Sequence, residues 1–185
     1  MAAALWIAAG VGYLTVEAVA ASRMWGYSYL TDYVSNLGRA DSPLSWWMNA
    51  AFRVQGMAFV IAGALTVRTA GPRRGGMAFI VSACAYGAGS VVVGLFPSGG
   101  SGATQVLHVA GASAAILGGN VAVLTAGWAG LPHASRALRL TGYGLGTVGL
   151  LSGRCWSRRT CRPASANAVR STRSSCGSCW PAWRC

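Results

Sequence analysis

Four long apolar stretches constrain this chain more than any other feature. They cover residues 2–21, 46–67, 76–96 and 106–130. Each has close to the roughly 20 residues that a helix needs to cross a bilayer core of about 30 Å. Backbone amides in lipid have to be hydrogen-bonded within their own segment, so such stretches cross as helices. The sequence therefore predicts an all-α fold, a polytopic transmembrane helix bundle.

A fifth apolar stretch begins near Leu140 and is cut short. The residues between Arg139 and Arg154 carry no charge. A run of about 14 such residues is more typical of a buried or re-entrant segment than of a complete span. We therefore expect a bundle of four spans and a truncated fifth, occupying residues 1–153.

The composition excludes a soluble domain. Charged residues make up 10% of the 185 residues and hydrophobic residues 54%, whereas soluble proteins carry about 25% charged residues. The net charge of +12 comes from 15 Arg against three acidic residues, and seven of these Arg lie in the last 32 residues. The other Arg flank apolar runs and form no polar face for a duplex, so we expect membrane lipids as partners and no nucleic acid.

The distribution of Arg predicts the orientation of the spans. Arg68, Arg73 and Arg74 follow the second stretch, and Arg136 and Arg139 follow the fourth. The segments after the first and third stretches carry balanced charge or none. Because Arg near the ends of spans is retained on the cytoplasmic side, we expect a multi-pass protein of the cell membrane with a cytoplasmic N-terminus.

Two further features concern the ends of the spans. Trp46 and Trp47 fall at the outer interface in this orientation, where indole rings prefer to lie. The first stretch ends in small residues around Ala18 and Ala20, so it has an alternative interpretation as a cleavable signal peptide. It lacks a basic leading region and is longer than a usual signal-peptide core, which favours a retained span.

Two ionisable residues fall inside the apolar stretches. Glu17 lies about one turn from the outer end of the first stretch, and Arg53 lies roughly two turns inside the second. A charge at the bilayer centre costs about 2.5–3.5 kcal/mol on insertion scales, so each group calls for a partner. We predict an ion pair between Glu17 and Arg53 that faces the bundle interior and has a structural role.

Other polar residues gather on the predicted outer side of the membrane. His108 begins the fourth stretch, and Asn49 lies near the start of the second. Asp32, Ser35 and Asn36 lie in the segment after the first. The sequence therefore predicts a polar cluster on the extracytoplasmic face, which is the candidate site.

The chemistry open to this cluster is restricted. His108, Asp32 and Ser35 are the candidate catalytic residues, but no GxSxG turn surrounds Ser35 as a strained nucleophile would require. A metal hydrolase needs about three His or carboxylate ligands. His108, Asp32 and Glu17 are the most that the chain could assemble, so no metal site and no cofactor is expected.

Small residues recur at helical spacing in the fourth stretch. His108, Gly111, Ala115 and Gly118 fall on one face. Such stripes let helix backbones approach closely. They predict either a packing seam within the chain or contact between copies in a homo-oligomer.

Four strings identify a family resemblance. YSYLTDYVSNLG, SPLSWWMNAAFRVQG, GLFPSGG and LHVAGASAAILGGNVAVL occur in this order. They resemble the bacterial membrane proteins catalogued as domain of unknown function 998, over about residues 1–151. The residues that carry the resemblance are Ser35, Leu37, Gly38, Trp47, Asn49, Phe52, Phe96, Pro97 and His108. The resemblance implies a six-helix membrane bundle and no known activity.

The chain departs from that family after about Leu151. It continues SGRCWSRRTCRPASANAVRSTRSSCGSCWPAWRC, with five of its six Cys in this segment. An abrupt change to Arg, Cys, Ser and Pro is typical of an out-of-frame reading of GC-rich DNA. We therefore expect residues 154–185 to be a disordered or frameshifted tail.

Two other interpretations of this tail stay open. One is a zinc site, because Cys176 and Cys179 form a CxxC pair. The spacing of Cys155 and Cys161, however, is too wide for a regular zinc knuckle. A basic segment on anionic lipid is the alternative, since each Arg near such a surface contributes about 1 kcal/mol. If the short fifth stretch does not cross, the tail stays in the cytoplasm, where thiols remain reduced.

Three hypotheses of function follow. The first is a non-enzymatic membrane protein with a role in lipid handling or membrane assembly, in which the outer polar residues hold helices together. The second is a membrane-embedded, metal-dependent lipid hydrolase that uses His108, Asp32 and Glu17. The third is a truncated product without function.

Overall fold

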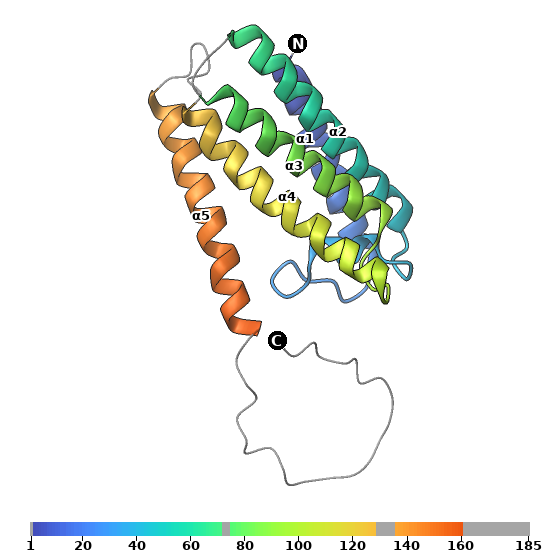
Figure 1. Cartoon of the computed structure of the whole chain (residues 1–185). Helices are drawn as coiled ribbons and strands as arrows, with labels where there is room; N and C mark the ends of the chain where they lie inside the picture. Colours follow the sequence, from blue (N-terminus) through green and yellow to red (C-terminus); the bar gives the residue numbers. More distant parts are fainter. Residues whose placement is uncertain (1, 72–74, 129–135, 161–185) are drawn as a thin grey trace, which may run out of the picture.

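Five α-helices make up most of the described chain in a computed structural model (Figure 1). The structure describes residues 2–71, 75–128 and 136–160. The α-helices are α1 (Ala2–Arg23), α2 (Ser45–Ala70), α3 (Gly76–Leu95), α4 (Ala103–Trp128) and α5 (Arg136–Thr160), and a short 3-10 helix, η1 (Val34–Gly38), lies between α1 and α2. These ranges contain no strand, which confirms the all-α prediction.

Four of the helices have the length and composition of membrane spans. In the described residues these are α1, α2, α3 and α4, each with 20 or more residues and a mean hydropathy between 1.5 and 1.9. The four predicted spans are therefore confirmed. The fifth helix is longer than its apolar stretch, because it continues through Arg residues on both sides, and it is not among the membrane-length apolar helices.

Each helix packs against the next one along the chain. Contacts join α1 to α2, α2 to α3, α3 to α4 and α4 to α5. Successive helices run in opposite directions, and α5 lies along the side of α4 (Figure 1). The helices α2, α3 and α4 thus each lie between two others, and α1 and α5 form the edges.

Glycines bring the central helices into backbone contact. A Cβ atom added at Gly56 of α2 would lie 2.6 Å from the carbonyl oxygen of Gly87 in α3. A Cβ atom added at Gly89 of α3 would lie 2.5 Å from the carbonyl oxygen of Gly111 in α4. Neither position has room for a side chain, so these helices pack through their backbones, as membrane helices do at small residues.

The small-residue stripe predicted on α4 is the α4 side of this packing. Gly111 meets Val92 and Gly89 of α3, and Gly118 meets the backbone of Tyr86. The stripe is therefore a seam within the chain, the first of the two roles that the sequence predicted for it.

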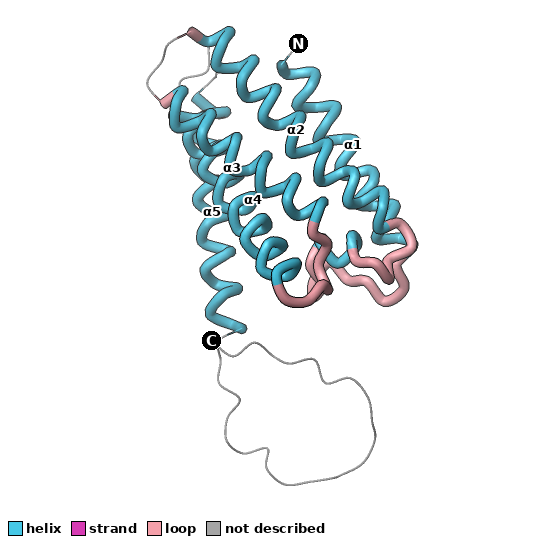
Figure 2. Tube along the Cα trace, turned by 45° about the vertical axis from the view of Figure 1, so that its right-hand side comes forward, coloured by secondary structure: helices cyan, strands magenta, loops and turns pink. Residues whose placement is uncertain are grey.

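The connecting segments divide the bundle into two ends. Residues 24–44 and 96–102 lie together at one end, which we call the capped end, and the N-terminus lies at the other, the open end (Figure 2). The predicted boundary at residue 153 falls inside α5, which continues to Thr160. Most of the predicted tail, residues 161–185, lies outside the described residues.

Candidate functional site at the capped end

The helix η1 inserts into the bundle at the capped end. Its Leu37 is fully buried and packs with Ala20 of α1 and Met48 of α2, which are also fully buried. Around these three residues lie the partly buried side chains of Tyr13, Val16, Ala21, Met24, Tyr27, Val34, Leu44 and Phe52. An apolar anchor therefore fixes the 24–44 segment to α1 and α2, and the polar residues of that segment are held by it.

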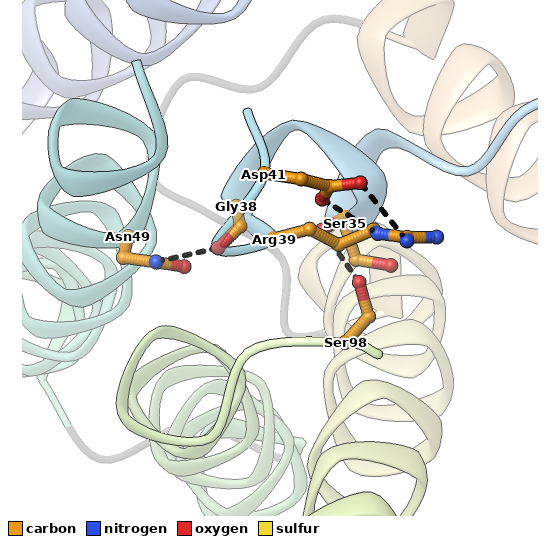
Figure 3. Close-up of polar contacts among 6 residues, drawn as sticks. All are labelled: Ser35, Gly38, Arg39, Asp41, Asn49 and Ser98. Carbon is orange, nitrogen blue, oxygen red and sulfur yellow. Dashed lines mark hydrogen bonds and ion pairs between the residues drawn. The ribbon is translucent and has the colours of Figure 1, made fainter. Parts of the chain in front are cut away.

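Asn49 ties η1 to the second helix. Its Nδ2 donates to the carbonyl oxygen of Gly38 at 2.8 Å (Figure 3). Gly38 is buried directly against the Asn49 amide, and a Cβ atom there would collide with Asn49 Oδ1. Asn49 and Gly38 thus fit each other as a pair.

A second hydrogen bond joins the two connecting segments. The hydroxyl of Ser98, between α3 and α4, donates to the backbone oxygen of Ser35, 63 residues earlier, at 2.9 Å (Figure 3). Beside it, Arg39 pairs with Asp41 at 3.0 Å and lies against Gly99, where an added Cβ would be 3.4 Å from Arg39 Nε. The two segments thus form one cap across the ends of four helices.

His108 closes the turn between α3 and α4. Its side chain is 5% exposed, and its Nδ1 lies 2.8 Å from the backbone oxygen of Phe96. Because a carbonyl oxygen accepts, Nδ1 carries the proton and donates. This contact binds the start of α4 to the end of α3, and it uses one of the two ring nitrogens for structure.

The structure does not assemble the relay considered from the sequence. Asp32 Oδ2 accepts from the backbone amide of Ser28 at 2.9 Å, and Ser35 is joined to the cap through its carbonyl oxygen. Among the described residues, no hydrogen bond connects the side chains of Ser35, His108 and Asp32. The Asp32 carboxylate and the His108 ring bond to backbone atoms, and the hydrogen bond to Ser35 involves its backbone oxygen.

A metal centre from His108, Asp32 and Glu17 is not formed either. Within residues 2–71, 75–128 and 136–160, no group of three or more His, Cys, Asp or Glu side chains could hold a metal ion. The three residues come from α1, the 24–44 segment and α4. These residues lie toward the same end of the bundle, but their side chains do not form one coordination sphere.

The predicted ion pair between Glu17 and Arg53 is also absent. Where the structure describes the chain, the one ion pair within 4.0 Å joins Arg39 to Asp41. Arg53 instead donates its Nε to the backbone oxygen of Asn49 at 3.1 Å. A residue count gives the depth of a residue along its helix, but pairing also depends on the rotation of the residue around the helix axis.

Helical phase explains this difference. Phe52 and Phe59 of α2 contact Tyr13 and Trp6 of α1, with ring centroids 5.8 and 4.2 Å apart, so their face of α2 is the one that meets α1. Arg53 follows Phe52 by one residue and is rotated by about 100° from it. It therefore lies against Gly94 of α3, away from the helix that carries Glu17.

Glu17 has tyrosines as its neighbours. It lies near the hydroxyl of Tyr13, one turn earlier in α1, and near that of Tyr27 in the following segment. Burial raises the pKa of the Tyr27 hydroxyl above its usual value, and the Glu17 carboxylate raises it further. This hydroxyl is buried and, among the described residues, has no hydrogen-bond partner.

Two features of the bundle lie outside what the sequence pattern identified. The first is the side chain of Ser98, which joins two segments by a hydrogen bond. In the sequence it is one of several Ser and Gly residues of a connecting segment, and nothing distinguishes it from the others. The second feature is apolar: a cavity of about 640 Å³ near the open end, lined from four helices by Ala2, Ala3, Trp6, Phe59, Thr66, Thr69, Phe79, Ala122, Val123 and Ala126. Apolar residues in a span carry no signal that distinguishes a cavity wall from a lipid-facing surface.

Comparison with known proteins gives one match. The model of a family described as "Protein of unknown function (DUF998)" matches residues 7–159. This range includes η1, the cap and the buried His108, and it extends beyond residue 151, where the sequence resemblance was expected to end. No curated protein and no solved structure matches the chain.

Proposed function

The chain belongs to this DUF998 family of unknown function, and because the family brings no activity with it, we propose a function from the structure: a non-enzymatic membrane protein that handles lipid by taking an acyl chain into its apolar cavity. The observation that carries the proposal is the cavity itself, of about 640 Å³, at the open end of four membrane-length helices.

The cavity belongs to a part of the bundle that is open at the side. Its walls include Trp6 from α1 and Val123 and Ala126 from α4. Yet α1 and α4 are not packed against each other as the consecutive helices are. A bound chain can therefore enter laterally from the bilayer, without passing through water.

The lining suits hydrocarbon and not a polar solute. Two hydroxyl side chains line the cavity, those of Thr66 and Thr69. Their hydroxyls already donate to backbone oxygens of α2, that of Thr66 to Ala62 at 2.7 Å and that of Thr69 to Leu65 at 3.0 Å. A water molecule needs about two to four polar partners to stay in a cavity. An acyl chain needs none.

The capped end supports a role without catalysis. His108, Asn49 and Ser98 direct their donors to backbone oxygens of neighbouring segments. Groups used in this way hold helices together, as the first hypothesis from the sequence required. The metal-dependent hydrolase has no comparable support, since the described residues offer no cluster of ligands.

Cross-linking in liposomes tests the proposal. The full chain is reconstituted with a phosphatidylcholine that carries a diazirine in one acyl chain, irradiated, and mapped by peptide mass spectrometry. We expect adducts concentrated on lining residues such as Trp6 and Phe59, above the level at Ile7, which is 66% exposed on α1.

A matched pair of variants completes the design. Val123→Trp fills the cavity from a residue that is 37% exposed, so the fold is preserved, and it should lower the adducts at Trp6 and Phe59 several-fold. Ile116→Trp adds the same ring two turns earlier on α4, outside the cavity, and should leave them unchanged. The proposal would be contradicted if, in both variants, the residues that line the cavity were labelled no more than the residues that face lipid.

A further inference from the structure

Arg53 is a charged residue inside a membrane span, and none of the described residues forms an ion pair with it. It lies eight residues after the start of α2, about 12 Å along the axis at a rise of about 1.5 Å per residue. Its side chain passes along Gly94 of α3, where an added Cβ would be 2.8 Å from Arg53 Cγ. The absence of a side chain at Gly94 makes room for the arginine stem between α2 and α3.

The guanidinium points toward the capped end and is incompletely used. Its Nε donates to the backbone oxygen of Asn49, one turn nearer to the start of α2, at 3.1 Å. For the two terminal nitrogens, the described residues supply no hydrogen-bond acceptor and no carboxylate within 4.0 Å. A charge at this depth costs free energy unless an anion compensates it.

The depth of the guanidinium matches that of lipid phosphates. Trp46 and Trp47 are 67% and 58% exposed at the start of α2, and exposed indoles mark the boundary between hydrocarbon and headgroups. Because Arg53 reaches back to the level of Asn49, its charge lies about one turn below these rings. A phosphate at the base of the headgroup layer is the anion available there.

An apolar groove starts on the same face of α2. It has a volume of about 500 Å³ and is lined by four residues of α2 and four of α3, all of them apolar. Its first residues on α2, Gly56 and Met57, follow Arg53 by three and four positions, so they continue the same helical face. At this groove Gly56 and Gly87 bring the backbones of α2 and α3 into close contact.

Charge and groove together define one ligand. We propose that the α2–α3 face binds an anionic phospholipid, with its phosphate on the Arg53 guanidinium and one acyl chain along the groove. Arginine suits this role, since its terminal nitrogens donate two parallel hydrogen bonds to phosphate oxygens. The site is separate from the cavity near the open end, and it offers a cation for the phosphate, which the lining of that cavity does not.

Native mass spectrometry of the full chain in detergent tests this site, with dioleoyl phosphatidylglycerol and dioleoyl phosphatidylcholine as probes. The wild type should retain phosphatidylglycerol in preference to phosphatidylcholine. Arg53→Gln should weaken phosphatidylglycerol binding by about tenfold, the effect of losing charge-assisted hydrogen bonds. Arg53→Lys, which keeps the charge, should recover part of the phosphatidylglycerol binding.

Arg68→Gln is the control. It removes an exposed charge at the opposite end of α2 and should have no effect on this binding.

A second variant tests the groove without touching the charge. Ala88→Trp alters an exposed position of the groove and should also weaken phosphatidylglycerol binding, with Arg53 intact and the fold preserved. Val123→Trp, in the other cavity, should leave this binding unchanged, so failure of either proposal is recognised separately. The inference would be overturned if Arg53→Gln and Ala88→Trp both retained phosphatidylglycerol as well as the wild type does. It would also be overturned if the wild type retained the two lipids equally.

Discussion

Several hydroxyl side chains in the spans form hydrogen bonds within their own helix. Thr15 donates to Val11 O, Thr66 to Ala62 O and Ser82 to Ala78 O, each four residues earlier in its own helix. A hydroxyl that bonds to its own helix costs little in lipid and does not use that hydrogen bond to join segments. The side chains that bond between segments are therefore the informative ones, and they gather at the capped end.

His108 is the clearest case for a test at the scale of one residue. His108→Leu keeps the volume but leaves the backbone oxygen of Phe96 without its donor, so we expect a loss of about 1–3 kcal/mol of stability. His108→Asn retains a donor at a similar position and should keep a larger part of the stability. Thermal unfolding midpoints in detergent micelles measure both.

Two results would contradict a structural role for this residue. One is a midpoint for His108→Leu equal to that of the wild type. The other is an equal loss in both variants, because the amide of Asn would then not replace the ring nitrogen.

The sequence predicts which polar residues belong to the candidate site, but it does not predict which atoms they contact. Asn49 and His108 were identified as unusual polar residues near the start of spans, and both make contacts that join segments. The partner of Arg53 was predicted wrongly, because a charge pattern gives depth along a helix and not rotation about it. Rotation is fixed by packing, here by Phe52 against Tyr13 and by the space at Gly94.

At the scale of elements, the spans follow from apolar length, and their ends do not. The helix α2 continues beyond its apolar stretch to Ala70. It ends there because the next residue, Gly71, adopts a φ of +73°. Similarly α4 begins at Ala103, just after Gly102 with a φ of +58°, so it includes the polar residues Thr104 and Gln105. Glycines in the left-handed region set these limits, since other residues adopt that conformation at a cost.

The contact between α3 and α4 gives a prediction for a single methyl group. Gly89→Ala adds a Cβ atom 2.5 Å from the backbone nitrogen of Ala115, which forces the helices apart, and we expect a loss of about 1–3 kcal/mol. Gly10→Ala on α1 is the control, since nothing lies within 4 Å of its added Cβ, and it should be neutral or slightly stabilising. Thermal unfolding in micelles compares the two.

The opposite order of stability would contradict packing through backbones in this seam. Equal midpoints for Gly89→Ala and Gly10→Ala would do so as well, because the first change introduces a contact and the second does not.

For the whole molecule, the arrangement of Arg predicts the topology. Arg68 and Arg136 lie near the open end, where α2 ends and α5 begins, so the inside rule for Arg assigns this end and the N-terminus to the cytoplasm. In a background with the six Cys replaced by Ser, Ser101→Cys in the cap should react with a membrane-impermeant maleimide in intact cells. Arg136→Cys should react after lysis alone. The reverse pattern would invert the topology.

The order of packing has a consequence for how this chain tolerates change. Among the described elements, α5 makes its main contacts with α4, so its glycine face, with Gly142 and Gly146 against Val123 and Leu124, can be lost without uncovering the seams between α1, α2, α3 and α4. Sequence change is therefore graded along the chain. An altered reading frame that began within α5 would spare the cap, the apolar cavity and the face of Arg53, so a gene damaged there would still encode both proposed binding sites.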